Sequence, residues 1–420
     1  MKMEYEIVII GAGPAGLAAA LAAAKSGKTI VIIDNNPAMG GQIWREGPIF
    51  PVPKLAQSLQ QQILECSNIK LISQAKVVAA PQVGQLLVEN VEHSFILNYQ
   101  KLILCTGARE IFLPFPGWTL LGVTGAGGLQ ALIKAGTPVK NEKIVIAGTG
   151  PLLLASADTA RKVGADVRYI AEQSKGAVVF QFARQLWQWP VKLIQALLLP
   201  HHLYKTDSYI IEAYGRNKLE GVKVQTSKGV VDIPCDRLAC GFGLTPNTQL
   251  AQLLGCDIQE QKIIVDDFQQ SSQEHILAAG ECTGFGGSEL ALFEGEIAGF
   301  VATGEIEKAR SLFKKRKYYQ NFANILNRSF QLRAELKTLA KPDTIFCRCE
   351  DVTYEKVAVR CNWVDAKLHT RCGMGACQGS TCSTSAKFLF NWQISNSRPP
   401  LLPTRAKSLI SLQSSSFNQS

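Results

Sequence analysis

The feature that most constrains this chain is a glycine turn that joins two short apolar runs near its start. The run Glu6–Ile10 leads directly into Gly11-Ala12-Gly13-Pro14-Ala15-Gly16, which opens an alanine-rich helical stretch. A second apolar run, Thr29–Ile33, follows and ends at Asp34. The order of strand, glycine turn, helix, strand and acid is typical of a dinucleotide-binding fold. The chain is therefore predicted to begin with a nucleotide-binding α/β domain.

Each residue type in this turn suits the binding of a pyrophosphate. Gly11 allows the tight turn out of the strand, and Gly13 lets a pyrophosphate approach the backbone because it carries no Cβ. Gly16 lets the helix pack closely on the sheet, and the free N–H groups at the helix N-terminus attract the phosphates. Asp34 lies where its carboxylate can accept hydrogen bonds from an adenosine ribose. The predicted cofactor-binding residues of this first site are Gly11, Gly13, Pro14, Ala15, Gly16 and Asp34.

Length and composition indicate an ordinary globular protein of two or three domains. The chain has 420 residues, of which 46% are hydrophobic and 19% are charged. Two uncharged stretches are long enough to span a bilayer, but Ile7–Ala24 contains the glycine turn and Ile111–Ile133 is interrupted by prolines and glycines. No signal-peptide layout is seen, because Glu4 and Glu6 precede the first apolar run. We therefore expect a cytoplasmic protein without a transmembrane segment.

The net charge of +10 is dispersed along the chain, apart from the run Lys314-Lys315-Arg316-Lys317. This run fits either a solvated helix face or a docking patch for an acidic partner. Nucleic acid is not an expected partner, because no nucleic-acid-binding motif accompanies the charge.

Three later segments place small residues where a backbone would pass close to a cofactor. Gly40-Gly41 precedes Gln42, whose side chain could hydrogen-bond a ligand. Thr106-Gly107 follows the apolar run Lys101–Cys105, and Gly280-Glu281 ends another apolar run. An acid in the position of Glu281 can hold a ribityl hydroxyl. These segments add the predicted cofactor-binding residues Gly41, Gln42, Thr106, Gly107, Gly280 and Glu281.

A second glycine turn, Gly148-Thr149-Gly150-Pro151-Leu152-Leu153, follows the apolar run Lys143–Ala147. A helical stretch and a strand then lead to Glu172, which repeats the order of the first unit. Leu153 replaces the third glycine, and we expect its side chain to push the helix off the sheet. Gly148, Gly150 and Glu172 are the candidate binding residues here. The occupant remains open between NAD(P), another adenine nucleotide and none.

The order of these motifs resembles that of flavoproteins in which a second dinucleotide-binding domain is inserted into the first. The matching segments are Gly11–Gly16, Asp34, Thr106-Gly107, Gly148–Gly150, Pro246-Asn247 and Gly280-Glu281. The resemblance implies an α/β fold with two Rossmann-like domains and FAD at the first site. It also implies that an expected strand over Ile69–Val78 contacts the adenine through the backbone of Val77. The cysteine motifs of the disulfide reductases are missing, so a thioredoxin-reductase type of activity is not expected.

Six of the twelve cysteines lie between Cys347 and Cys382. In a reducing compartment such crowding favours metal or redox chemistry over structural disulfides. The first two cysteines form a CxC motif, and a glycine-rich stretch with CxxxxC spacings, Cys372–Cys382, follows. Glycine-rich turns free backbone N–H groups that can hydrogen-bond the sulfurs of an iron–sulfur cluster.

These cysteines resemble those of the small helical 2Fe–2S domain of the bacterioferritin-associated ferredoxin type. The ligands that we expect from the resemblance are Cys347, Cys349, Cys377 and Cys382. Cys372 is a fifth candidate that could replace one of them, because its spacing from Cys377 equals that of Cys382. Zinc bound by the same thiolates is the main alternative. Cys361 is interpreted as a core or surface thiol.

The whole pattern is most similar to that of the subunits that opine oxidase, hydrogen cyanide synthase and D-hydroxyproline dehydrogenase use to carry FAD and an iron–sulfur centre. The segments that carry this resemblance are Gly40–Arg45, Leu113–Thr119 and Ala147–Leu154. It implies a discontinuous FAD domain over residues 1–118 and 246–305 and a second nucleotide-binding domain over 119–245. A linking segment over 306–341, a small helical 2Fe–2S domain over 342–394 and a tail over 395–420 complete the expected organisation.

Two functions of different classes follow. The first is a redox subunit that relays electrons from an amino acid, opine or other secondary amine oxidised by a partner flavoprotein subunit of the amino-acid-oxidase type. A small ferredoxin-like subunit is a candidate further partner. The second is a stand-alone NAD(P)H-dependent flavin reductase that passes electrons out through the cluster. A non-catalytic scaffold that holds an adenine nucleotide is a third possibility. The sequence identifies no catalytic base and no substrate pocket.

Overall fold

The computed structural model describes residues 2–394 and 398–410, and it divides into two compact units. The first unit comprises Met1–Arg109, Pro246–Asn324 and Asn396–Ser420. The second comprises Glu110–Thr245 and Ile325–Ser395. The chain thus leaves the first unit earlier than the boundary expected at residue 118. The expected linking segment is shared between the two units, because their boundary falls after Asn324.

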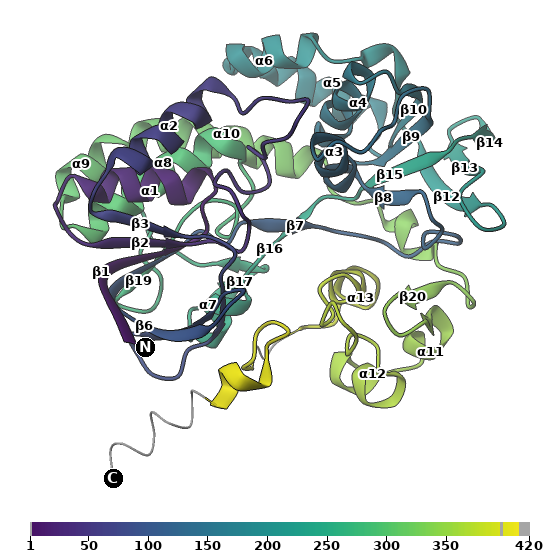
Figure 1. Ribbon diagram of the computed structural model, residues 1–420. Helices are drawn as coiled ribbons and strands as arrows, with labels where there is room; N and C mark the ends of the chain where they lie inside the picture. The colour runs from purple at the N-terminus through teal and green to yellow at the C-terminus, as the bar shows by residue number, and fades with distance from the viewer. Residues whose placement is uncertain (1, 395–397, 411–420) are drawn as a thin grey trace. The chain divides into compact units, whose positions relative to one another are not determined.

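A seven-stranded sheet forms the centre of the first unit, in the order β3-β2-β1-β6-β5-β4 with β19 beside β6 (Figure 1). Strands β1, β2, β3, β6 and β19 run parallel, with Ile7 opposite Ile30 and Ile10 opposite Leu104. Strands β4 and β5 add an antiparallel hairpin at one edge. The bounds are β1 Lys2–Ile10, β2 Ile30–Ile33, β3 Ile69–Ile72, β4 Lys76–Ala79, β5 Gln85–Glu89, β6 Ser94–Leu104 and β19 Ile276–Ala278.

Helices α1 (Pro14–Ala24) and α8 (Gly287–Ala302) lie side by side on this sheet (Figure 1). They approach closely because α8 presents Gly295 and Gly299 to α1. A Cβ at Gly295 would lie only 2.1 Å from the carbonyl oxygen of Ala15. The remaining elements of the first unit are α2 Lys54–Glu65, β7 Ala108–Glu110, β16 Leu244–Pro246, α7 Gln249–Leu253, β17 Ile258–Gln259, β18 Lys262–Ile263, α9 Ile306–Ser311 and α10 Phe313–Ser329, of which β7, β16 and α10 extend across its boundaries.

The second unit repeats the architecture with a five-stranded parallel sheet in the order β11-β10-β9-β15-β8. Its strands are β8 Val123–Gly125, β9 Lys143–Gly148, β10 Asp166–Glu172, β11 Tyr204–Lys205 and β15 Arg237–Gly241. Its helices are α3 Ala126–Lys134, α4 Leu152–Lys162, α5 Gly176–Gln185 and α6 Pro190–Leu197, with short 3₁₀ turns η1 Leu186–Gln188 and η2 His201–Leu203. An antiparallel sheet of β12 Tyr209–Tyr214, β13 Gly221–Thr226 and β14 Gly229–Pro234 completes it.

A small cysteine-rich module ends the second unit. It comprises η3 Ala334–Thr338, β20 Ile345–Cys347, β21 Val352–Thr353, α11 Tyr354–Ala358, α12 Trp363–Thr370 and α13 Cys382–Phe390. Its own core includes Phe346, Val357 and Trp363. Two hydrogen bonds tie it to the rest of the unit, from Ser385 Oγ to the carbonyl of Phe112 (2.5 Å) and from Trp118 Nε1 to that of Ile345 (2.5 Å).

Two expectations about these strands and helices need correction or qualification. The single strand expected over Ile69–Val78 is wrong, because a turn with Gln74 in the left-handed region divides it into β3 and β4. Leu153 does not push α4 away as an unaccommodated side chain would. It is fully buried, and Gly241 opposite it makes the room, since a Cβ there would lie 3.0 Å from Leu153 Cδ2.

The tail is only partly extended. Residues 406–410 are helical, and Arg405 and Ser408 hydrogen-bond Glu89 on β5. Residues 395–397 and 411–420, which belong to the same expected tail, lie outside the described residues. Among the residues that are described, no helix is both long and apolar enough to cross a bilayer.

Candidate functional site

The glycines of the first turn divide into two that serve packing and one that leaves space. Gly11 has a φ of +111°, and a Cβ there would lie 2.2 Å from the carbonyl oxygen of Cys105. A Cβ at Gly16 would lie 1.8 Å from the carbonyl oxygen of Gly11. Gly13 differs, because the nearest atom to its Cβ position is the Cα of Gly41, at 3.9 Å. The backbone at Gly13, which is the N-cap of α1, is therefore open to a ligand.

The second glycine pair, which was expected to pass close to a ligand, lies against the first turn. The N–H of Gly40 donates to the carbonyl of Ala12 (2.8 Å), and a Cβ at Gly41 would lie 3.0 Å from the Cα of Gly13. The neighbouring Gln42 is exposed, and its Oε1 accepts a hydrogen bond from Arg45 Nη2 (2.5 Å). Gly41 is thus part of the cradle at Gly13, and the Gln42 side chain is held by Arg45.

Asp34 closes the turn at the carboxyl end of β2. One carboxylate oxygen accepts from the N–H of Ala12 (2.5 Å) and the other from the N–H of Asn36 (2.7 Å). The backbone N–H of Ala75 donates to the carbonyl of Asp34 (2.9 Å). The start of β4, which includes Val77, therefore lies near the carboxyl end of β2. A hollow of about 290 Å³ opens at this edge, lined by Asn35, Gln74, Ala75, Lys76, Glu89, Asn90, Val91 and Arg405. It lies where the adenosine end of the cofactor is expected.

Thr106 and Gly107 are fixed by Asn247. Thr106 Oγ1 donates to the carbonyl of Asn247 (2.6 Å), and Asn247 Nδ2 donates to the carbonyl of Thr106 (2.9 Å). The N–H of Asn247 also donates to the carbonyl of Gly107 (2.9 Å). The Thr-Gly and Pro246-Asn247 segments, far apart in sequence, thus form one structural element.

The segment Gly280-Glu281 also meets the first turn. Gly280 has a φ of +82°, and a Cβ there would lie 2.8 Å from the Cβ of Ala15 on α1. Burial raises the pKa of Glu281, which follows it. The structure therefore brings Gly13, Ala15, Gly41 and Gly280 together as a narrow backbone cradle. Such a cradle, whose largest side chain is the methyl group of Ala15, fits a pyrophosphate at the N-terminus of a helix.

A buried carboxyl group, that of Glu294, lies against this cradle and was not predicted from the sequence. Glu294 on α8 accepts from the N–H of Gly280 (2.9 Å) and from Thr283 Oγ1 (3.3 Å), and it is 5% exposed. Burial raises its pKa to about 7, although these hydrogen bonds and the charge of Arg316 oppose the rise. Glu294 is one of three acids in α8, with Glu289 and Glu296, and nothing in the sequence marks it as the buried one.

The second turn has the same local geometry, but its polar groups are already occupied. Glu172 accepts from the N–H of Gly150 (2.7 Å), the N–H of Ser174 (2.8 Å) and the hydroxyl of Tyr204 (2.8 Å). Glu172 is fully buried. Gly148 serves packing, since a Cβ there would lie 2.1 Å from the carbonyl oxygen of Gly241.

Three of the candidate metal ligands form a compact buried group. The sulfur atoms of Cys347, Cys372 and Cys382 all lie within 4.8 Å of one another. Hydrogen bonds from Cys372 and Cys382 lower the pKa of Cys347 to about 2, against burial, which raises it. The same contact with Cys347 raises the pKa of Cys382, and it raises that of Cys372 to about 12. Thiolates are the species that ligate metals, and these three sulfur atoms are close enough together to contact one metal ion.

Cys349 and Cys377 are adjacent to each other, and their side chains hydrogen-bond. They also interact electrostatically with the buried trio, Cys349 with Cys347 and Cys377 with Cys372. Five thiols thus share one neighbourhood. All twelve cysteines of the chain lie within the described residues and are free thiols. The exposed Cys361 is outside this group.

The glycines around the thiols allow the backbone to approach the cysteines closely. The N–H of Gly373 points to Cys347 Sγ (3.5 Å), and a Cβ at Gly375 would lie 2.5 Å from Cys349 Cβ. Cys372 was expected only as a replacement ligand, but it lies in the buried trio with Cys347 and Cys382. The feature of the sequence that pointed to it was its distance from Cys377, which equals that of Cys382.

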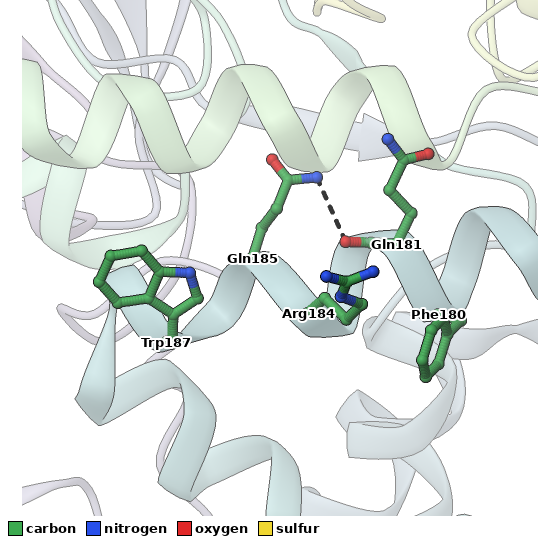
Figure 2. A pocket seen from close by; sticks show the side chains of 5 residues that line it. All are labelled: Phe180, Gln181, Arg184, Gln185 and Trp187. Carbon is green, nitrogen blue, oxygen red and sulfur yellow. Dashed lines mark hydrogen bonds between the residues drawn. The ribbon is translucent and has the colours of Figure 1, made fainter.

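A shallow hollow over α5 and η1 is a poor candidate site. It measures about 550 Å³ and is lined by Phe180, Gln181, Arg184, Gln185 and Trp187. Figure 2 shows that these side chains all come from one helix and the turn after it, with Gln185 Nε2 bonded to the carbonyl of Gln181. Arg184 is the one ionisable group among them, so the hollow offers no group of convergent polar atoms.

Comparison with known proteins identifies the family of the nucleotide-binding part of the chain. Residues 5–309 match the family described as pyridine nucleotide-disulphide oxidoreductase. One subunit of the opine oxidase of Rhizobium meliloti is 28% identical over 92% of this chain and 81% of its own length. The hydrogen cyanide synthase subunit HcnB of Pseudomonas aeruginosa is 30% identical over 90% of this chain and 91% of its own.

Among solved structures, the L-proline dehydrogenase of P. horikoshii is similar, with a TM-score of 0.70 at 16% identity. The match covers 97% of this chain and 80% of that one. The thioredoxin reductase of Lactococcus lactis matches with a TM-score of 0.54 at 19% identity and covers 74% of this chain and 99% of its own. These likenesses concern the fold. They agree with the predicted α/β class and its Rossmann-like nucleotide-binding folds.

Proposed function

Because this chain belongs to the pyridine nucleotide-disulphide oxidoreductase family, we propose that it is the electron-relay subunit of a larger FAD-dependent oxidoreductase. In this proposal it carries FAD and one 2Fe–2S cluster. A partner flavoprotein subunit of the amino-acid-oxidase type oxidises an amino acid, opine or other secondary amine. Two relatives whose names describe them as subunits, of opine oxidase and of hydrogen cyanide synthase, support an assembly of several subunits.

FAD fits the cradle of the first unit. Gly13 and Gly41 would lie against the pyrophosphate, and Asp34 and the backbone at Val77 against the adenosine. Thr106, Gly107 and Glu281 would lie along the rest of the cofactor. The fit is supported by the open space at Gly13, because the other two glycines of the turn, Gly11 and Gly16, are tightly packed.

The observation that carries the proposed relay is the five-thiol neighbourhood of Cys347, Cys349, Cys372, Cys377 and Cys382. A 2Fe–2S cluster takes four thiolates, and the four that we expect are Cys347, Cys349, Cys377 and Cys382. A flavin accepts a hydride or two electrons, whereas such a cluster passes electrons singly. Two of these four ligands, Cys347 and Cys382, are buried and would help to shield a bound group from water.

The alternative is a stand-alone reductase that takes electrons from NAD(P)H at Gly148, Gly150 and Glu172. It requires a free crevice at the second turn. The hydrogen bonds that already occupy Glu172 weigh against it. Zinc at the thiols is the alternative to iron, and the same cysteines would hold it.

Metal analysis and spin-resonance spectroscopy of the anaerobically purified chain test the proposal. We expect about two irons per chain and, after dithionite reduction, the signal of a reduced 2Fe–2S centre. Cys347→Ser should lower or abolish both while FAD stays bound. The matched control is Cys361→Ser, which changes an exposed thiol of the same module. Stoichiometric zinc without iron would contradict the relay.

Co-purification tests the partner. The chain should be recovered from its native cells together with a second flavoprotein that oxidises an amine or amino acid. Recovery of an active NAD(P)H reductase without any second subunit would favour the alternative.

A further inference from the structure

The segment Phe330–Arg333 crosses the carboxyl ends of β9 and β10, where the second glycine turn lies. Thr149 Oγ1 lies 3.3 Å from the carbonyl oxygen of Phe330 and can donate to it. Gln173 Nε2 donates to the carbonyl of Gln331 (3.0 Å), and the N–H of Arg333 donates to Gln173 Oε1 (3.0 Å). Arg333 Nη1 also donates to the carbonyl of Gln173 (3.1 Å). The segment is therefore bonded to the turn residue Thr149 and to the residue that follows Glu172.

The ring of Phe330 lies over the glycine that a pyrophosphate would approach. A Cβ at Gly150 would be 3.7 Å from Phe330 Cγ, which is ordinary contact distance. Phe182 on α5 packs edge-on against Phe330, with ring centroids 5.1 Å apart. In a dinucleotide-binding fold the pyrophosphate lies at this point, against the N-terminus of the helix. The phenyl ring stands in its place.

The polar groups beneath the segment are satisfied without a ligand. Thr149, Glu172, Gln173 and Ser174 are all less than 9% exposed. An adenosine ribose could reach Glu172 only after the segment had moved away. Moving it would break the bonds of Gln173 to the segment and leave buried donors and acceptors unpaired, which is unfavourable.

We propose that this segment of the chain itself occupies the second dinucleotide-binding crevice and excludes adenine nucleotides from it. The inference extends the proposed function, because it assigns FAD as the only nucleotide that the chain holds. The first turn provides the internal comparison, since no side chain of the described residues lies within 4 Å of the Cβ position at Gly13. The same segment leads into the cysteine module, so the second turn serves as an anchor for that module.

Equilibrium dialysis of the full chain, with FAD saturating the first site, tests the proposal. The probes are NAD⁺, NADP⁺ and ADP, none of which can reduce the flavin. We expect no saturable binding of any probe below about 1 mM. The double variant Phe330→Ala/Gln173→Ala should bind NAD⁺ or ADP at least about tenfold more tightly than the unchanged chain. Phe180→Ala, which removes a phenyl ring that is 65% exposed on α5, is the control and should behave as the unchanged chain.

Hydrogen exchange gives a second measurement that does not depend on how the variants fold. The amide of Arg333 should be protected in the unchanged chain, and its protection should not respond to the probes. Micromolar binding to the unchanged chain, an unprotected Arg333 amide, or no gain of affinity in the folded double variant would each overturn the proposal. Flavin content is measured beforehand, so a failure of FAD binding is recognised separately.

Discussion

At the scale of single residues, glycines of one motif perform different tasks. Gly16 is required for packing, because a Cβ there would overlap the carbonyl oxygen of Gly11 at 1.8 Å. Gly13 has no such close neighbour among the described residues, and its lack of a side chain leaves room for a ligand. Substitutions at the two positions should therefore fail for different reasons, one through the fold and the other through the cofactor.

Gly13→Ala should weaken FAD binding by at least about tenfold, or roughly 1.4 kcal/mol, while the chain remains folded. The methyl group would stand between the pyrophosphate and the backbone N–H groups. Flavin absorbance per chain and a dialysis titration measure the effect. The control is Gly128→Ala in the second unit, where a Cβ would lie 3.8 Å from its nearest neighbour, Glu110 Oε2. A yellow Gly13→Ala protein with full flavin content would contradict the assignment of the site.

Glu294 should make stability depend on pH. Its pKa rises through burial from 4.5 to about 7, so its contribution is present below pH 4.5 and is lost as the pH rises through 7. The rise corresponds to about 3 kcal/mol. Glu294→Gln should therefore gain stability relative to the unchanged chain between pH 5 and pH 8, as measured by thermal unfolding with FAD present. Glu274→Gln, which changes an exposed carboxylate, should show no such gain.

Local spacing made the fold around the first glycine turn predictable, whereas contacts between residues far apart in the sequence leave no local pattern. Gly11–Gly16 and Asp34 lie within one short stretch, and their roles follow from the fold that this stretch forms. The accommodation of Leu153 depends on Gly241, and the orientation of Arg316 depends on Asp267, to which it is paired while being 4% exposed. Neither partner is marked by any local pattern, so the run Lys314–Lys317 could not be resolved from sequence into its buried and solvated members.

At the scale of elements, the helices and strands with clear apolar periodicity were predicted well. Both glycine turns lie between a strand and a helix, as the order of apolar runs around them predicted. The predicted strand over Ile69–Val78 failed because the turn between the two short strands, Ser73-Gln74-Ala75, contains neither glycine nor proline and so gives no strong turn signal in the sequence. The crossing of Phe330–Arg333 over the second turn had no local signal at all, since it joins residues about 160 to 180 positions apart.

The end of the described chain is held by one buried acid. Glu89 accepts from the N–H of Arg405 (3.0 Å) and from Ser408 Oγ, and it pairs with Lys76 (3.1 Å). The guanidinium of Arg405 donates to the carbonyls of Asn90, Val91 and Glu92. This segment contributes Arg405 to the hollow at the expected adenosine end of the first site.

Glu89→Gln should release this segment, because charge-assisted hydrogen bonds are stronger than neutral ones by about 1 kcal/mol. Trypsin should then cut after Arg405 about fivefold faster, since cleavage follows the population of the open form. Mass spectrometry of a timed digest measures the rate. Glu92→Gln is the control, because its side chain is exposed and does not touch Arg405 through its carboxylate. Equal rates in all three proteins would show that Glu89 does not hold the segment.

At the scale of the whole molecule, the chain combines two Rossmann-like folds whose glycine turns differ in how open they are. Both units carry parallel strands with a glycine turn at their carboxyl ends. The first turn is open at Gly13, and the second is covered by Phe330. The cysteine module belongs to the second unit, so the covered turn is structurally joined to the expected metal centre. Electrons should therefore reach this chain from a partner and not from a nicotinamide nucleotide.

This division of use predicts that NADH and NADPH reduce the flavin of the isolated chain poorly. A hydride donor must lie against the flavin, and its adenosine half needs the crevice that Phe330–Arg333 covers. In stopped-flow mixing under anaerobic conditions, we expect no rapid and saturable loss of flavin absorbance with either nucleotide at micromolar concentration. Dithionite is the control, because it should reduce the same sample fully and so prove that the flavin is competent. Fast saturable reduction by NADH would assign the chain to the stand-alone reductases, and it would mean that the segment moves aside during turnover.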